Sequence, residues 1–269
     1  MITKFLKIIF RNFPILKGKI WKIWYTYLGN TVKTSDLKFM NYGYFREDFN
    51  PSLSEDDEKE RYPIQLYHYL CSKVEFSNSN VLEVGSGRGG GADYISRTFS
   101  VTKICGLDIS SSAIDLCKKF YKSNKLSFLQ GSADMLPFEN NIFDIVINVE
   151  SSHCYPNFNN FLKEVYRVLK PSSYFLITDF RPSSEIEGFH KSISNYYKII
   201  YQEEITSNII TALDLMSVKR SKQIKSFMPT FLSSVSSSFA GIKGSELYES
   251  FENRELRYFM YVLQVEKGE

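Results

Sequence analysis

Cysteine and histidine are scarce in this chain, and neither type is arranged as a metal site. Four cysteines, at positions 71, 105, 117 and 154, and three histidines stand among 269 residues. The cysteines show no paired Cys-x-x-Cys spacing and are too few for a disulfide-rich secreted scaffold. We therefore expect reduced thiols, a cytoplasmic location and no bound metal.

An excess of charge of either sign is also missing. The formal net charge is only +3, and beyond the first segment basic and acidic residues are spread evenly. Nucleic-acid-binding proteins carry strongly basic faces or recognisable zinc and aromatic motifs, and none of these occurs here. The sequence therefore predicts no nucleic-acid partner, whereas its aromatic content of 16% fits a globular enzyme with an apolar ligand cavity.

Long uncharged hydrophobic runs are absent, even from the apolar N-terminus. A spanning helix needs about 20 nearly uncharged residues, and a signal peptide needs an uncharged apolar core. The first thirty positions instead mix aliphatic and aromatic residues with six lysines and arginines, and no acid precedes Asp36. We expect basic amphipathic helices broken near Pro14 in a segment spanning 1–60. Such helices can pack on the core, cover a substrate site as a lid, or make peripheral membrane contact.

A glycine-rich loop that directly follows an apolar strand is the most informative feature that the chain does contain. Residues 81–91 read Val-Leu-Glu-Val-Gly-Ser-Gly-Arg-Gly-Gly-Gly, with glycines at 85, 87 and 89. Glycine permits a tight turn and close approach of a ligand to the backbone. Asp108 ends the next apolar run, near the offset of about twenty residues at which an acid reaches a ribose hydroxyl. Together these residues predict a βαβ unit that binds a nucleotide-type cofactor.

Glu83 indicates which cofactor the loop holds. A carboxylate at the end of the strand would repel a pyrophosphate but suits a positively charged ligand such as the sulfonium of S-adenosylmethionine. The pattern resembles motif I of the class I S-adenosylmethionine-dependent methyltransferases, and later segments match as well. The resemblance implies a cofactor site that includes Glu83, Gly85, Gly87, Gly89, Asp108 with Ile109, Ala133, Asp134, Met135, Asn148 and Glu150. The alternative for Glu83 and Asp108 is a turn-capping role. Asn148 and Glu150 either hold the methionine moiety or the substrate hydroxyl, or only cap the loop.

Within that class, the sequence is most similar to the phthiotriolone and phenolphthiotriolone dimycocerosate methyltransferases, and more distantly to rifamycin-type polyketide O-methyltransferases. The resemblance spans most of the chain and is carried by Phe39–Tyr44, Gln65–Tyr69, Gly85–Tyr94, Asn148–Pro156 and Asp179–Pro182. It implies that Tyr42 and Tyr44 cover the methionine end of the cofactor. One departure is that Ser172 and Ser173 stand where the family usually has glycines.

Alternating strand and helix patterns predict the fold class. Apolar runs near 80–84, 103–108, 126–130, 142–149 and 174–179 alternate with helical patterns near 91–99, 111–124 and 158–169, which is typical of a parallel doubly wound sheet. We expect a Rossmann-like seven-stranded α/β fold with its cofactor-binding core at 61–182. A helical lid is expected at 183–238. Residues 239–269 should complete the sheet with a strand pair at 239–242 and 257–265.

Two histidines are the candidates for a catalytic base. His153 follows the fourth strand, at the sheet edge where ligands bind in such folds, and its neutral imidazole can accept a proton near physiological pH. The alternative is that it only lines the pocket. His190, at the start of the expected lid, can approach from above, whereas His68 is expected beside the cofactor or in the core. Asp179 and Arg181 either orient the substrate or pair with each other, and Arg88 should turn away from the cofactor or reach its carboxylate.

The function that we predict is S-adenosylmethionine-dependent O-methylation of a hydroxyl on a bulky, apolar polyketide or lipid-like small molecule. Transfer to carbon or nitrogen is an alternative on the same fold. A cyclase or pericyclase that binds the cofactor without transferring methyl is another, and a scaffold without catalysis is a fourth. Fold alone does not decide among them.

Overall fold

Strands and helices alternate along the part of the chain that the computed structural model describes, residues 37–227 and 241–267. The strands are β1 (Ser79–Val84), β2 (Val101–Asp108), β3 (Leu126–Gln130), β4 (Phe143–Val149), β5 (Leu169–Pro182), β6 (Tyr197–Glu204) and β7 (Leu256–Val265). The helices are α3 (Glu55–Glu58), α4 (Arg61–Cys71), α5 (Gly90–Thr98), α6 (Ser111–Phe120), α7 (Phe158–Val168), α8 (Ile186–Ser194), α9 (Thr206–Phe227) and α11 (Glu246–Glu252). Two 3-10 turns, η1 (Ser152–Cys154) and η2 (Ser183–Glu185), follow β4 and β5.

All seven strands form one sheet in the order β3-β2-β1-β4-β5-β7-β6. The first five strands in that order are parallel, and β7 runs antiparallel to both of its neighbours, β5 and β6. The chain leaves β1 toward β2 and β3 and later returns on the other side of β1 with β4. Ligands bind at such a switch point, beside the carboxyl ends of the strands. The predicted Rossmann-like seven-stranded fold is confirmed.

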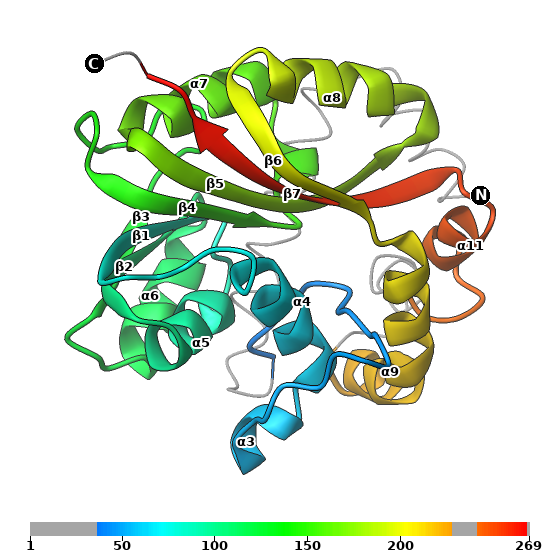
Figure 1. Ribbon diagram of the computed structural model, residues 1–269. Helices are drawn as coiled ribbons and strands as arrows, with labels where there is room; N and C mark the ends of the chain where they lie inside the picture. Colours follow the sequence, from blue (N-terminus) through cyan, green and yellow to red (C-terminus); the bar gives the residue numbers. More distant parts are fainter. Residues whose placement is uncertain (1–36, 228–240, 268–269) are drawn as a thin grey trace.

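Helices cover both faces of the sheet, and each face has its own apolar core (Figure 1). Helices α4, α5 and α6 lie against one face, where Ile95 and Ile114 join the cluster; α7 and α8 lie against the other, with Phe161 and Phe189. Because both faces are covered, β4 is buried along almost its whole length, as its apolar sequence predicts. Polar side chains therefore gather at the carboxyl ends of the strands.

Ser172 and Ser173, the departures from the family pattern, lie in β5. Ser172 is exposed and has a φ of 60°, in the left-handed region that favours glycine. Ser173 is buried and donates a hydrogen bond from its hydroxyl to the Lys170 carbonyl. The departure is thus confined to a bend at the start of the strand, away from its carboxyl end.

One strand of the expected C-terminal pair is confirmed, and its expected partner is wrong. Residues 257–265 do form β7, but its edge partner is β6 and not 239–242. Gly241 and Ile242 lie in a turn that leads to α11, and the Ser245 N–H donates to the Ile242 carbonyl; residues 239–240 lie outside the described residues. The misassignment arose because β6, with its alternating exposure, shares a polar composition with the helices around it.

The first part of the helical lid expected at 183–238 is also wrong, because β6 shares a polar composition with the helices around it. Helix α8 packs against one face of the sheet and β6 is a strand of it, so both belong to the core. Among the described residues of this range, α9, which follows β6, is the one element that keeps the position of an insertion. Its neighbour α11 packs against it, and both lie beside the carboxyl end of the sheet (Figure 1).

The predicted N-terminal amphipathic helices fall on residues 1–36, which lie outside the described residues, so the lid and membrane-contact hypotheses for them stay predictions. In the described part of the chain, no helix combines the length and the apolarity needed to cross a bilayer.

Candidate active site

The glycine loop forms a tight turn between β1 and α5. Gly85, Gly87 and Gly89 all have positive φ, at 76°, 52° and 79°. A Cβ atom on Gly85 would lie 2.3 Å from the Ser151 hydroxyl oxygen, and one on Gly87 would lie 2.7 Å from the terminal methyl of Met40. The loop therefore requires glycine for its conformation and for the close approach of neighbouring groups, as predicted.

Asp108 lies directly against this loop. One of its carboxylate oxygens accepts a hydrogen bond from the Gly87 N–H at 2.8 Å, and the other accepts one from the Ser110 N–H at 2.9 Å. Burial raises the pKa of the carboxyl, and these backbone donors oppose that rise. The strand end, the acid and the glycine loop thus come together as the sequence predicts.

Ile109 and residues 133–135, which are also expected in the cofactor site, lie along the same sheet edge. The Gly131 N–H donates to the Asp108 carbonyl at 3.0 Å, which places the segment after β3 beside the end of β2. Ile109 and Met135 are large apolar residues with 47% and 75% of their surface exposed. Ala133 and Asp134, which directly precede Met135, are partly exposed. The Ser132 hydroxyl donates to Asp134. Two exposed apolar side chains at one edge provide a surface suited to a flat aromatic ring.

Glu83 is fully buried behind the glycine loop. Its Oε1 accepts a hydrogen bond from the Tyr67 hydroxyl at 2.7 Å, and its Oε2 has no partner among the described residues. Burial raises the pKa of Glu83 to about 8. A buried carboxylate without full compensation is costly, so this site attracts a proton or a cation.

These features fit S-adenosylmethionine. The glycine turn gives a ligand access to the backbone, and Asp108 offers a carboxylate. Ile109 and Met135 offer apolar cover. Glu83, whose Oε2 has no hydrogen-bond partner among the described residues, favours a positively charged ligand. Replacing Gly87 with alanine should weaken binding of S-adenosylmethionine at least about tenfold, because a side chain is strained at this φ and crowds Met40. Isothermal titration calorimetry measures this change.

The matched control is Gly188→Ala on α8, where an added Cβ meets no atom within 4 Å. It should bind the cofactor as the wild type does. Equal affinity of the two variants would contradict the assignment of the loop as the cofactor cradle.

Asn148 and Glu150, at the end of β4, have different surroundings. Asn148 is buried and donates to the Val84 carbonyl at 2.9 Å and to the hydroxyls of Ser151 and Tyr155, so it ties β4 to the start of the glycine loop. Glu150 has a φ of 45°, a strained conformation for this residue type. Burial raises its pKa to about 8.

Glu150 connects segments that are distant in sequence. Its Oε1 accepts hydrogen bonds from the Tyr42 N–H at 2.8 Å and from the Tyr258 hydroxyl at 2.7 Å. The rings of Tyr42, Phe180 and Phe251 pack on one another at centroid distances of 5.5–5.9 Å. Tyr42 is therefore placed at the carboxyl edge of the sheet, in aromatic surroundings next to β4 and β5.

Tyr44 lies elsewhere. It is fully buried and stacks on Tyr69 with ring centroids 4.5 Å apart. The structure thus places Tyr44 in the aromatic core beside α4, apart from Tyr42, because Gly43 between them has a φ of 80° and the segment is not regularly extended. A contact between Tyr44 and the cofactor stays a prediction.

His153 and Asp179 form a hydrogen-bonded pair at the ends of β4 and β5. The Nδ1 of His153 lies 2.8 Å from Asp179 Oδ1, and its backbone N–H donates to Asp179 Oδ2 at 2.9 Å. The Ser152 hydroxyl and the Phe180 N–H also donate to this carboxylate. Asp179 is buried, yet its pKa is lowered, because the charges of His153 and Arg181 outweigh the effect of burial. With Nδ1–H directed at Asp179, Nε2 carries the lone pair of the neutral ring.

The other two histidines are not part of this arrangement. His190 packs edge-on against the rings of Phe259 and Tyr261, on the face of the sheet that α7 and α8 cover, and burial lowers its pKa. It does not approach from a lid, since α8 belongs to the core. His68 Nδ1 lies 2.6 Å from the Tyr94 hydroxyl and has a structural role.

The Arg88 side chain is buried and points toward the segment that begins at Leu37. Its Nε donates to the Leu37 carbonyl. The side chain therefore binds the segment that begins at Leu37, and a contact with the cofactor carboxylate stays a prediction.

Sequence reasoning missed several groups that complete the site. Tyr67 and Tyr258 donate to the two raised-pKa carboxyls, and Arg220 of α9 donates to the Asn41 carbonyl with its guanidinium 5.9 Å from the Tyr42 ring centroid. Tyr67 stands inside a segment that already matched the family, which was an available signal. Tyr258 and Arg220 reach the site only through the pairing of β7 and the packing of α9.

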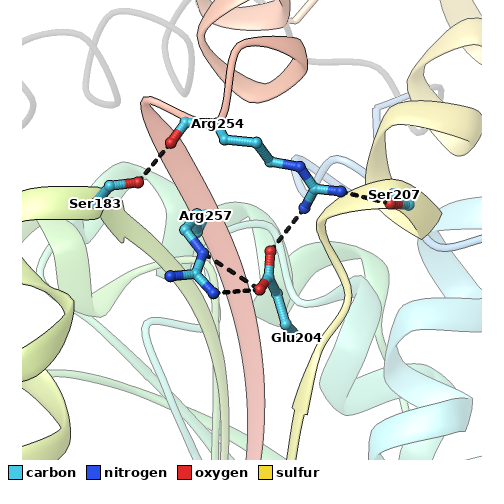
Figure 2. Close-up of a pocket in the computed structure, with 5 residues that line it drawn as sticks. All are labelled: Ser183, Glu204, Ser207, Arg254 and Arg257. Atoms are coloured by element: carbon cyan, nitrogen blue, oxygen red, sulfur yellow. Dashed lines mark hydrogen bonds and ion pairs between the residues drawn. The ribbon is translucent and has the colours of Figure 1, made fainter.

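A second polar hollow lies near the ends of β5 and β6 (Figure 2). It is lined by Ser183, Glu204, Ser207, Arg254 and Arg257. Both guanidinium groups pair with the Glu204 carboxylate, and Arg254 also donates to Ser207 at 2.9 Å. Since its charges are largely paired with one another, the hollow is a surface ion-pair network. Within residues 37–227 and 241–267, no group of three or more His, Cys, Asp or Glu side chains is placed to hold a metal.

The profile of a family described as "Methyltransferase domain" matches residues 82–177, which run from within β1 through the glycine loop to within β5. The chain is 35% identical over 245 residues to the phthiotriol/phenolphthiotriol dimycocerosates methyltransferase of Mycobacterium tuberculosis (strain H37Ra), covering 90% of this chain and 91% of that protein. It is 41% identical over 195 residues to a fatty-acid O-methyltransferase of Mycolicibacterium smegmatis, covering 72% and 71%.

Solved structures share the fold at lower identity. The [4+2]-cyclase SpnF superposes with a TM-score of 0.67 at 15% identity, covering 93% of this chain and 95% of that one. Geranyl diphosphate C-methyltransferase from Streptomyces coelicolor, in a complex that includes S-adenosyl-L-homocysteine, superposes with a TM-score of 0.65 at 13% identity, covering 93% and 98%. These likenesses concern the fold alone.

Proposed function

The chain belongs to the family of the phthiotriol/phenolphthiotriol dimycocerosates methyltransferases and is an S-adenosylmethionine-dependent methyltransferase, and from this premise we propose that it methylates a hydroxyl oxygen of a bulky, lipid-like molecule. The observation that carries the choice of acceptor is the His153–Asp179 pair. An alcohol holds its proton tightly at neutral pH, so a positioned base assists its methylation. A carboxylic acid is already ionised and needs no base.

In this proposal the residues of the chain have separate tasks. The glycine loop, Glu83 and Asp108 hold the cofactor, which supplies an electrophilic methyl group bonded to a sulfonium. His153 accepts the proton of the acceptor hydroxyl at Nε2, and Asp179 stabilises the imidazolium that results. The base and the cofactor loop stand at the same sheet edge, which supports an arrangement in which alignment contributes much of the rate.

The surroundings of the pair favour an apolar acceptor. The His153 ring lies over Phe180 with centroids 4.3 Å apart, and Phe180 packs against Tyr42 and Phe251. The relatives named above act, by their names, on dimycocerosates and on fatty acids. A long-chain alcohol or a phenol with an apolar tail combines both requirements.

A fatty-acid carboxylate is the second candidate acceptor. One relative is a fatty-acid O-methyltransferase, and the guanidinium of Arg220, near Glu150 and Tyr42, is a cation that a carboxylate would favour. Against it, a carboxylate needs no base, so the His153–Asp179 pair would have no task in its methylation.

The test incubates the protein and S-adenosylmethionine with a long-chain secondary alcohol or with a fatty acid of matched length. Product gains the mass of one methyl group, and alkaline hydrolysis separates an ether, which survives, from an ester, which does not. We expect the alkali-stable ether. Formation of methyl ester alone would overturn the hydroxyl assignment in favour of the carboxylate.

A further inference from the structure

Arg181 completes a buried hydrogen-bond network behind Asp179. Its guanidinium donates to the Ser152 hydroxyl at 2.7 Å, and that hydroxyl donates to Asp179 Oδ2 at 2.6 Å. A guanidinium nitrogen also lies 3.2 Å from the same carboxylate oxygen. Arg181 thus contacts Asp179 both directly and through Ser152.

The guanidinium is held in one place by its other neighbours. It donates to the Phe180 carbonyl at 2.7 Å, and its central carbon lies 4.4 Å and 5.2 Å from the ring centroids of Phe189 and Phe158. Only 8% of the side chain is exposed. A cation fixed between two rings and screened from water acts on nearby charges more strongly than a surface arginine does.

Asp179 therefore lies between two groups that compete for its charge. His153 occupies Oδ1, and Arg181 approaches Oδ2. The carboxylate favours a proton on the imidazole, whereas the positive charge of Arg181 compensates the carboxylate and disfavours a second positive charge beside it. Removing the arginine charge should leave the imidazolium form more stable.

We infer that Arg181 is a positioning residue for the proposed base: it fixes the Asp179 carboxylate that holds Nδ1 of His153, and its positive charge opposes a second positive charge on the imidazole. The assignment of His153 as a base rests on the proposed function. The coupling between Arg181, Asp179 and His153 rests on the contacts alone. Other titratable or charged groups near the pair are Glu150 and Cys154 on the same loop, Tyr42 in the segment before α3, Tyr258 on β7 and Arg220 on α9.

Nuclear magnetic resonance titration of the imidazole signals tests this coupling without substrate. The chain has three histidines, so the signals are assigned by comparison with single His→Gln variants. Arg181→Met removes the charge and keeps an apolar stem between the two phenylalanine rings. We expect the titration midpoint of His153 to rise by about one pH unit in this variant, and less in Arg181→Lys. The midpoint of His68, which contacts Tyr94 instead, should stay where it is.

An unchanged His153 midpoint in folded Arg181→Met would overturn the inference. If that variant does not fold, Arg181→Gln serves the same comparison. In the methylation assay, the acid limb of the kcat/KM profile should move to higher pH with the His153 midpoint, a change that a purely structural role would not produce. A wild-type protein that methylates no hydroxyl compound would count against the proposed function, while the titration would still decide the coupling.

Discussion

Replacing His153 with alanine is expected to lower kcat for an alcohol acceptor by about 10²–10⁴, the usual contribution of a general base. The expectation follows from the position of the ring, which Asp179 holds through Nδ1 at the carboxyl edge of the sheet. Asp179→Asn should cause a large loss as well, because an amide does not stabilise an imidazolium. Single-turnover rates with saturating cofactor measure the effect on the chemical step.

His190→Ala is the matched control for this prediction. His190 packs on Phe259 and Tyr261, so its loss should lower the melting temperature but leave the rate of methyl transfer within a few-fold of the wild type. Cofactor affinity should be unchanged in all three variants. A His153→Ala enzyme that keeps the wild-type rate would contradict base catalysis and favour transfer to a carbon or nitrogen atom that needs no deprotonation.

The cofactor half of the site could be predicted from the sequence because it is local. Gly85, Gly87 and Asp108 lie on one βαβ unit, in which a strand, a turn and the next strand fix their relative positions. His153 could be placed at the carboxyl edge for the same reason, since η1 directly follows β4. Such positions depend on backbone geometry that a short segment specifies by itself.

The acceptor half depends on contacts between distant segments. The Tyr258 hydroxyl reaches Glu150 across 108 residues, and this contact exists only because β7 pairs with β5 and β6. Assigning α8 and β6 to a lid misplaced His190. The partner of Glu150 was missed for another reason: residues 257–265 were expected as a strand, but its place between β5 and β6 does not follow from the sequence. Tyr42 and Tyr44 lie in different surroundings for a further reason: Gly43 between them has a φ of 80°, so the backbone turns there, and the sequence alone does not specify this turn.

Glu83 provides the other large effect. Its pKa in the folded protein is raised to about 8 from a usual value near 4.5, because it is fully buried. Below the unfolded-state pKa the carboxyl is protonated in both states and has no effect on stability. As the pH rises toward 8, the unfolded chain loses this proton before the folded protein does, so the free energy of unfolding falls. We expect a loss of order 2–4 kcal/mol for the cofactor-free protein between pH 5.5 and 8.5 from each such group.

Glu150, whose pKa is also raised to about 8, should act in the same direction. Glu83→Gln preserves the shape and an acceptor for the Tyr67 hydroxyl but has no proton to lose. The variant should therefore be more stable than the wild type at pH 8.5 and nearly equal to it at pH 5.5. Urea unfolding at the two pH values measures the difference, and Glu75→Gln, which changes an exposed carboxylate, is the control.

Cofactor binding should show the opposite sign. A positively charged ligand near Glu83 favours its ionised form, so binding of S-adenosylmethionine should release a proton and tighten as the pH rises from 6 to 8, by up to about tenfold per pH unit. Glu83→Gln should bind more weakly and with less dependence on pH, and titration of the ligand itself cancels in the comparison. A variant that gained stability and kept the affinity of the wild type would show that Glu83 supports the loop without sensing the charge of the cofactor. If ionisation of Glu83 instead lowers the stability of the cofactor-free protein and tightens cofactor binding, then the buried carboxylate is destabilising in the absence of the cofactor. The positive charge of the cofactor compensates it.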